Sequence, residues 1–269
     1  MSQNQSDTPD IWRQIEQKTR LFEESGLRQN LDYEKFVVYS IVTHSTAIEG
    51  STLTEQEAEL LFESGLTAKG KPLVYHLMNT DLKNAYIFAM AQAREELLLS
   101  ADFLRSLNAM VMKSTGGPNS VMAGDFDSSK GEFRLCGVSA GVGGRSYVNY
   151  QKIPGMVDAL CDKLNHQLSI GHETIGPREL YEAAFGAHLD LATIHPWVDG
   201  NGRTARLLMN FLQFRLGLVP TKTFSEDRGD YIAALRESQD TGAPSYFLTF
   251  MARQHLKTLD GELAGVNLT

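Results

Sequence analysis

Apolar residues recur at helical spacing along almost the whole chain, and this pattern restricts the fold more than any other feature of the sequence. The clearest run lies between residues 180 and 194, where apolar positions follow one another at intervals of four, three, four and three, so that they share one helix face. These residues are Leu180, Ala184, Ala187, Leu191 and Ile194. We therefore predict an all-α protein.

Capping and breaking residues set the expected ends of the helices. Asp10 is placed to cap the first helix, and Thr54 with Glu57 forms an S/T-x-x-E capping box. Gly26 and Gly50 end the first two helices. The expected helices cover 11–24, 32–50, a short segment after Thr54, 81–99, 102–113, 154–171, 178–194, 204–216, 230–239 and 245–259.

One glycine-rich segment, residues 131–151, departs from the helical pattern. Its sequence GEFRLCGVSAGVGGRSYVNYQ holds five glycines and two short β-prone pieces, Phe133–Val138 and Arg145–Tyr150. Two such pieces with glycines between them are typical of a hairpin. We predict a small β-hairpin here.

Acidic residues outnumber basic ones, 33 against 25, which gives a formal net charge of −8. This balance argues against a nucleic-acid coat or a polybasic membrane contact, because both use dense Lys and Arg. Two cysteines are too few for a disulfide scaffold. No apolar run approaches the length of a membrane span, and the polar start lacks a signal-peptide core. We expect a cytoplasmic protein, with neither nucleic acid nor membrane as a partner.

The segment from His195 to Arg206, HPWVDGNGRTAR, carries the most chemistry. Pro196 disfavours the α conformation at His195, so the preceding helix ends there and the imidazole projects into a loop. The next helix begins at once, and its free N–H groups carry roughly half a positive charge. Arg203 and Arg206 are expected in its first turn, where each cation is disfavoured by about 0.3–1 kcal/mol. Two arginines at a helix N-terminus indicate an anion site, most simply for phosphates.

Two further residues complete a reactive set around this anion site. Asp199 adds a carboxylate, and a carboxylate beside phosphates is the usual way in which proteins hold Mg²⁺. His195 supplies a base that works near neutral pH. The set fits the attack of a hydroxyl on a nucleotide phosphate.

The same twelve residues resemble the Fic motif, HxFx(D/E)GNGRxxR, with Trp197 in place of the usual Phe. The resemblance implies an all-α, Fic-type helical bundle with a β-hairpin flap over the active site. It assigns His195 as the base and Asp199 as the Mg²⁺ ligand. It places Asn201 and the amides of Gly200 and Gly202 on the phosphates of ATP, with Arg203 and Arg206 on the β- and γ-phosphates.

The resemblance extends to the flap and to the nucleobase. In Fic proteins a flap aligns the side chain that is modified, and Arg134 stands at the arginine of the family's G-x-[YF]-R pattern. An unpaired strand edge there could receive a target segment as an added strand. Tyr231 is either a neighbour of the adenine or a core aromatic. The expected target-binding residues are Arg134, Leu135, Cys136, Gly137 and Val138.

A second motif, STAIEG at residues 45–50, resembles the inhibitory (S/T)xxxE(G/N) helix of the family. Glu49 lies at the end of its helix, where the dipole disfavours a carboxylate by about 0.3–1 kcal/mol, so a cationic partner is expected elsewhere. The family's partner is the second arginine of the motif, here Arg206. Ser45 and Glu49 are thus expected to inhibit the protein from within the same chain.

Together these features predict a protein adenylyltransferase, which moves AMP from Mg-ATP to a Ser, Thr or Tyr hydroxyl of a target protein. A homodimer is also an option, since related proteins often dimerise. The expected divisions are an N-terminal helical region at 1–98 with the inhibitory helix at about 32–50, a Fic core at 99–260 with the flap at about 131–151 and the catalytic loop at 195–206, and a tail at 261–269.

Other functions on the same scaffold stay open at this point. They are another phosphate or nucleotidyl transfer, removal of AMP with Glu49 positioning a water, and a catalytically silent nucleotide-binding regulator. Phosphorylating relatives carry Lys where this chain has Gly202, which argues against phosphorylation. An intact His195 argues against a pure binding protein, because binding alone requires no base.

Overall fold

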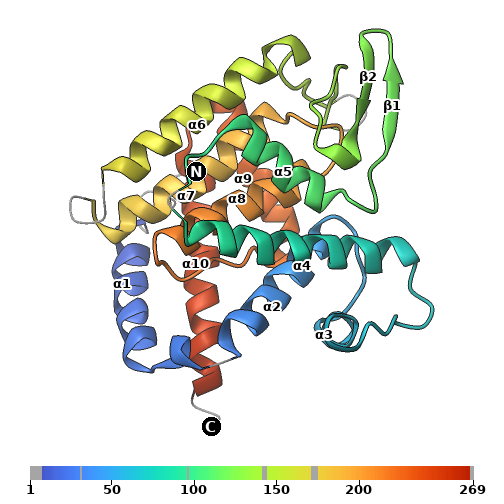
Figure 1. Cartoon of the computed structure of the whole chain (residues 1–269). Helices are drawn as coiled ribbons and strands as arrows, with labels where there is room; N and C mark the ends of the chain where they lie inside the picture. Colours follow the sequence, from blue (N-terminus) through green and yellow to red (C-terminus); the bar gives the residue numbers. More distant parts are fainter. Residues whose placement is uncertain (1–7, 31, 96, 141–143, 171–174, 267–269) are drawn as a thin grey trace.

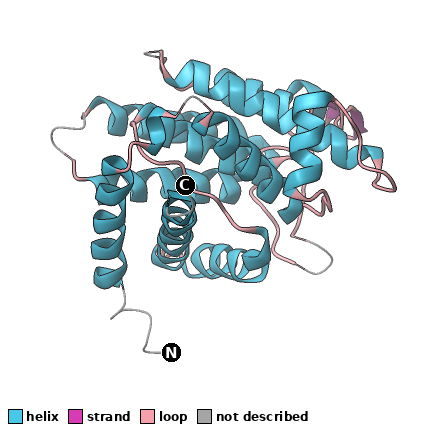
Figure 2. Cartoon of the chain, turned by 90° about the horizontal axis from the view of Figure 1, so that it is seen from below, coloured by secondary structure: helices cyan, strands magenta, loops and turns pink. Residues whose placement is uncertain are grey.

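Helices make up nearly all of the secondary structure in the computed structural model, which describes residues 8–30, 32–95, 97–140, 144–170 and 175–266 (Figure 1). Figure 2 shows strand in only one small region. The helices are α1 (Thr8–Glu24), α2 (Tyr33–Ile48), α3 (Glu55–Ser64), α4 (Leu73–Ala93), α5 (Ala101–Val111), α6 (Ile153–Ser169), α7 (Pro177–Ile194), α8 (Asn201–Arg215), α9 (Arg228–Thr241) and α10 (Ser245–Val266).

The prediction of an all-α protein is confirmed, and several helix ends are too. Thr54 and Glu57 form the predicted capping box, in which the Thr54 Oγ1 accepts from the Glu57 N–H and the Thr54 N–H donates to the Glu57 carboxylate. Gly50, with a φ of 102°, follows the end of α2 as expected. These ends follow from local chemistry, so the sequence alone can locate them.

Other predicted ends were wrong. Helix α4 begins at Leu73 instead of 81 and ends at Ala93 instead of 99. Its first two turns carry mixed polar and apolar residues, and Pro72 directly before them is compatible with a helix start. Asp10 does not cap α1, which begins at Thr8; its carboxylate instead accepts hydrogen bonds from the side chains of Arg13 and Gln14. Helix α10 runs on to Val266, through the first part of the stretch expected as a tail.

The regular hairpin lies at a different place from the predicted one. Strands β1 (Pro118–Val121) and β2 (Gly124–Asp127) pair antiparallel, with Asn119 opposite Phe126. Neither predicted piece, 133–138 or 145–150, forms a strand, and residues 141–143 between them lie outside the described part of the chain.

The predicted pieces nevertheless lie side by side. They meet at one antiparallel bridge between Ser139 and Ser146, and the Tyr147 N–H donates to the Val138 carbonyl at 3.0 Å. The carbonyls of Cys136 and Val148 accept from the Arg134 side chain instead of entering a strand ladder. This segment, residues 131–151, is called the flap segment below.

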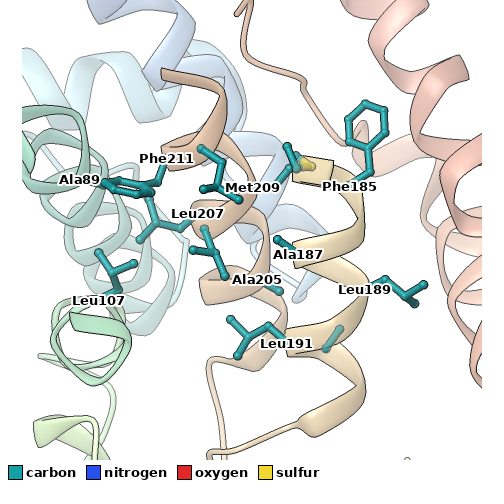
Figure 3. Close-up of a cluster of buried hydrophobic side chains, with 14 of the residues drawn as sticks. Ala89, Leu107, Phe185, Ala187, Leu189, Leu191, Ala205, Leu207, Met209 and Phe211 are labelled. Carbon is teal, nitrogen blue, oxygen red and sulfur yellow. The ribbon is translucent and has the colours of Figure 1, made fainter. Parts of the chain in front are cut away.

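Helix α8 forms the centre of the molecule. It packs against α2, α4, α5 and α7, and almost every one of its side chains is buried. Figure 3 shows Leu207 and Phe211 of α8 on the side of Ala89 and Leu107, whereas Leu189 and Leu191 belong to the neighbouring α7. Helix α1 lies along α10 at the edge of this core. The central position of α8 fixes the loop that precedes it.

In the part of the chain that the structure describes, no helix combines the length and the apolar character that a membrane span requires.

Truncating the centre of α8 should cost far more than truncating an exposed apolar residue. Leu207 is fully buried, so Leu207→Ala should lower the free energy of unfolding by about 2–5 kcal/mol. Leu60 on α3 is 47% exposed, and Leu60→Ala should change it by less than about 0.5 kcal/mol. Urea denaturation of both variants measures the difference. Equal losses would contradict the central role of α8.

Candidate active site

The turn between α7 and α8 presents His195. Its backbone has φ 53° and ψ 59°, and it is the only non-glycine residue with a positive φ among the described residues. The His195 N–H still closes α7 by donating to the Leu191 carbonyl at 2.9 Å. The helix therefore ends at the residue before Pro196, as predicted, and it ends in a left-handed conformation that costs free energy in a residue with a side chain.

The Asn201 side chain closes the loop that follows. Its Oδ1 accepts from the Trp197 N–H at 3.0 Å, and its Nδ2 donates to the Trp197 carbonyl at 2.8 Å. Asn201 is only 3% exposed. The Asn201 side chain thus shapes the loop, and its contact with phosphate stays a prediction.

Trp197 anchors the loop in the core of the protein. The side chain is fully buried, and its indole Nε1 donates to the Gly131 carbonyl at 3.0 Å. Phe, the residue usual at this position of the motif, has no N–H and could not make this bond. The single departure from the motif therefore adds a direct connection between the loop and the start of the flap segment.

Arg134 makes a second connection between the loop and the flap segment. Its guanidinium is fully buried and donates to three backbone carbonyls: His195 at 2.9 Å, Cys136 at 2.6 Å and Val148 at 2.6 Å. Burial lowers the pKa of Arg134 below its ordinary value. The expectation that this side chain faces a target protein was therefore wrong, because it organises the backbone around His195.

The residues that follow Arg134 are at least partly accessible. Gly137 is exposed, and Leu135, Cys136 and Val138 are half-buried. Their role in binding a target stays a prediction.

The N-terminus of α8 carries Asp199 and Arg203. The Asp199 Oδ1 accepts from the Gly200 N–H at 2.5 Å and lies 3.3 Å from Nη2 of Arg203. The Asp199 side chain is 67% exposed, whereas Arg203 is 3% exposed. Within the described part of the chain, Nε and Nη1 of Arg203 are buried and have no hydrogen-bond partner. A buried guanidinium with unused donors favours an anion or ordered water beside it.

Arg206 lies in the second turn of α8. The prediction that it lies in the first turn was therefore wrong. Arg206 is 2% exposed, and its Nη2 lies 2.6 Å from the Glu49 Oε1. Its Nε donates to the Ser45 Oγ at 2.7 Å, and Nη2 also donates to the Ser45 carbonyl at 3.0 Å. The predicted partner of Glu49 is thus present, and Ser45 supplies two of the bonds that hold it.

Gly202 lets Glu49 approach the first turn of α8. A Cβ at Gly202 would lie 2.6 Å from the Glu49 Oε1 and 3.1 Å from Nη1 of Arg206. The Glu49 carboxylate therefore rests on the first turn of α8, where the sequence predicts phosphates. Burial raises the pKa of Glu49, but Arg206, with Arg203 and Arg228, outweighs burial, so the pKa lies below its ordinary value of 4.5.

Tyr231 supports Arg206 from α9. It is 2% exposed, and its hydroxyl lies 3.2 Å from Nη1 of Arg206 and 2.9 Å from Nε2 of His188. Burial, with Arg206 nearby, lowers the pKa of His188 well below its ordinary value, so this histidine is neutral. The sequence by itself assigns His188 no role, although this residue lies on the same helix as His195 and precedes it by seven positions.

A cavity of about 870 Å³ opens in front of these residues. Its lining includes His195, Glu49, Gly202, Tyr147 and Tyr231. Burial lowers the pKa of His195 to about 4. A hydrogen bond to the backbone of Ala192 raises the pKa, but its effect is smaller than that of burial. The imidazole is therefore neutral at neutral pH, which is the state a general base requires.

The described residues contain no cluster of three or more His, Cys, Asp or Glu side chains that could by itself enclose a metal ion. Asp199 is a single exposed carboxylate, and such a group fits a cation that takes most of its ligands from water and phosphate.

Similarity to known proteins agrees with this geometry. Residues 98–213 match the Fic/DOC family. The protein adenylyltransferase Fic of Drosophila virilis is 32% identical over 230 residues, which are 84% of this chain and 43% of that relative. Protein adenylyltransferase fic-1 of Caenorhabditis elegans is 30% identical over 204 residues, or 75% of this chain and 36% of the relative. The chain belongs to the Fic/DOC family.

Solved structures share the Fic fold. Fic-1 from C. elegans (residues 134–508) superposes with a TM-score of 0.76 at 23% identity, over 97% of this chain and 74% of that one. A Fic-domain signaling protein from Bacteroides thetaiotaomicron gives a TM-score of 0.76 at 22% identity, over 94% and 98%. This Fic chain spans less than half the length of the two curated relatives named above.

A double-mutant cycle tests the close approach of Glu49 to the Fic motif. Gly202→Ala would force the Glu49 carboxylate off its present position, so it should destabilise the wild-type protein more than the Glu49→Gly variant. The expected coupling energy is about 1 kcal/mol. Urea denaturation of the four proteins measures it. Additive effects would mean that Glu49 does not rest on Gly202 in solution.

The ion pair between Glu49 and Arg206 should make stability depend on pH. The folded pKa of Glu49 is lowered, so its contribution is complete well above pH 4.5 and is lost as the pH falls through the folded value. The stability gap between wild type and Glu49→Gln should shrink over that acid range, as read from urea midpoints. Glu59→Gln on the exposed face of α3 is the matched control. A constant gap would argue against the pair.

Proposed function

We propose that the protein transfers AMP from ATP to a Ser, Thr or Tyr hydroxyl of a target protein, and that Glu49 inhibits this activity. The observation that carries the proposal is the position of a neutral His195 in the same cavity as Asn201 and Gly202, which begin α8. Arg203 and Arg206 follow in the first and second turns of that helix. The curated relatives are named protein adenylyltransferases, which supports the same activity.

The reaction needs one proton transfer and one displacement. His195 accepts the proton of the target hydroxyl, and the hydroxyl oxygen attacks the α-phosphorus of ATP. The bond from that phosphorus to the oxygen bridging the α- and β-phosphates breaks, and pyrophosphate leaves. Because an ordinary hydroxyl is a weak nucleophile, a neutral and positioned imidazole contributes about 10²–10⁴-fold to the rate.

The phosphates are held by the α8 N-terminus in this proposal. The free N–H groups of the first turn and the unused donors of Arg203 provide the positive field. Such groups are fixed before ATP binds, so they need no reorganisation when charge develops on the phosphates. Asp199 would hold Mg²⁺ beside the phosphates, and the ion would neutralise part of the charge on the leaving pyrophosphate.

In this proposal the Glu49 carboxylate competes with the ATP phosphates for the positively charged N-terminus of α8. The carboxylate lies on Gly202 and bonds to Arg206, so an ATP phosphate cannot take this position while Glu49 is there. We therefore propose low basal activity that rises when Glu49 is removed. The target protein would dock along the flap segment, next to His195.

Intact-mass analysis after incubation with ATP and Mg²⁺ tests the proposal. Glu49→Gly should show an AMP-sized adduct, on itself or on lysate proteins, at a level at least about tenfold above wild type, whereas Glu49→Gly/His195→Ala should show none. Glu95→Gly is a matched control, since Glu95 is also an exposed glutamate just past the end of a helix.

Each other result has a definite meaning. A phosphate-sized adduct would replace AMP transfer by phosphorylation. ATP binding without any adduct in Glu49→Gly would favour a nucleotide-binding regulator instead.

A further inference from the structure

An aromatic ring from the flap segment covers the imidazole of the candidate base. The Tyr147 and His195 rings have their centroids 3.7 Å apart and an interplanar angle of 14°, so they are stacked face to face. Both residues line the same cavity. The stack covers one face of the imidazole, while both ring nitrogens lie in the plane, where they can still form hydrogen bonds.

We propose that Tyr147 is a positioning residue for His195, which fixes the plane of the imidazole and excludes water from one of its faces. The inference rests on the proposed function only where it calls His195 the base. The contact itself depends on the aromatic ring and not on the tyrosine hydroxyl.

The backbone on both sides of the stack is held by one buried side chain. Arg134 donates through Nε to the His195 carbonyl and through Nη2 to the Val148 carbonyl, next to Tyr147. The Tyr147 N–H is also bonded, to the Val138 carbonyl. The backbone that carries each ring is therefore held by a buried, charge-assisted hydrogen bond or lies next to one.

A second contact joins this part of the flap segment to α9. Nη1 of Arg145 lies 3.2 Å from the Asp240 carboxylate, and both residues line the cavity. This pair is 42% and 66% exposed, so it adds little by itself. It shows, however, that the segment around Tyr147 is held from the α9 side as well as from the loop side.

The fixed imidazole has two consequences for a base. Its orientation is set by the left-handed backbone, by the hydrogen bond to Ala192 and by the stack, so less ordering remains when a hydroxyl arrives. The stack also contributes to the burial that favours the neutral form.

Several charges face the same ring. Arg134 lowers the pKa of His195, whereas Asp199 and Glu49 raise it, and burial is the largest influence. Replacing Tyr147 leaves all three charges in place. Removing the aromatic ring should therefore raise the pKa of His195 toward its ordinary value of 6.5 through hydration alone.

Histidine NMR titration of the full chain tests the proposal without requiring any activity. Tyr147→Ala should raise the pKa of His195 by about one unit, and Tyr147→Phe, which keeps the ring, should leave it nearly unchanged. Tyr246→Ala, at an exposed tyrosine of α10, is the matched control. Tyr147→Gln replaces the Ala variant if that one does not fold, since it keeps part of the volume but neither stacks nor excludes water from the imidazole. A His195 pKa that is the same in all variants would overturn the proposal.

Activity in the Glu49→Gly background separates this inference from the proposed function. Tyr147→Phe should stay within about twofold of its parent, whereas Tyr147→Ala should lose about tenfold or more in AMP transfer, with the acid limb of the pH–rate profile moved toward higher pH. If the pKa shift appears and no variant transfers AMP, the positioning role stands and the proposed function fails. If AMP transfer is unchanged in Tyr147→Ala, the positioning role fails.

Discussion

The buried guanidinium of Arg206 is the constraint on which the rest of the site depends. A cation that is 2% exposed is costly unless polar groups surround it, and two separate elements supply those groups. Ser45 and Glu49 come from the end of α2, and Tyr231 comes from α9. Because each bond has a narrow geometry, Arg206 fixes how α2 and α9 pack around α8. The same charge that requires this packing also creates the attraction for an anion.

Arg134 is a second buried cation, and its hydrogen-bond partners are of a different kind. Its guanidinium is also fully buried, but its three bonds go to backbone carbonyls. These carbonyls belong to His195 and to two residues of the flap segment. One arginine therefore holds the Glu49 carboxylate near the first turn of α8, and the other holds the loop and the flap segment against each other. The central α8 and the buried Trp197 keep both arrangements in register.

The contacts around Arg206 are compatible with the proposal that one residue serves both inhibition and catalysis. If Glu49 leaves, Arg206 keeps its bonds to Ser45 and Tyr231, so its guanidinium remains in place for a phosphate. Tyr231, whose hydroxyl also contacts His188, belongs to this support and also lines the cavity in front of His195. A site of this kind needs only one side chain to move, while the field of the α8 N-terminus stays fixed.

The sequence alone determined the helices with clear periodicity, the capping box at Thr54, the end of a helix before Pro196 and the position of the Fic motif at residues 195–206. All of these depend on neighbours within a few positions of the chain. It could not determine that Asn201 closes the loop, that Arg134 is buried, that β1 and β2 form the regular hairpin, or that Tyr147 stacks on His195. In each case a polar group or ring has several possible contact partners, and the local sequence does not select one of them. The partners are far apart in the chain, so they come into contact only when the helices pack around α8.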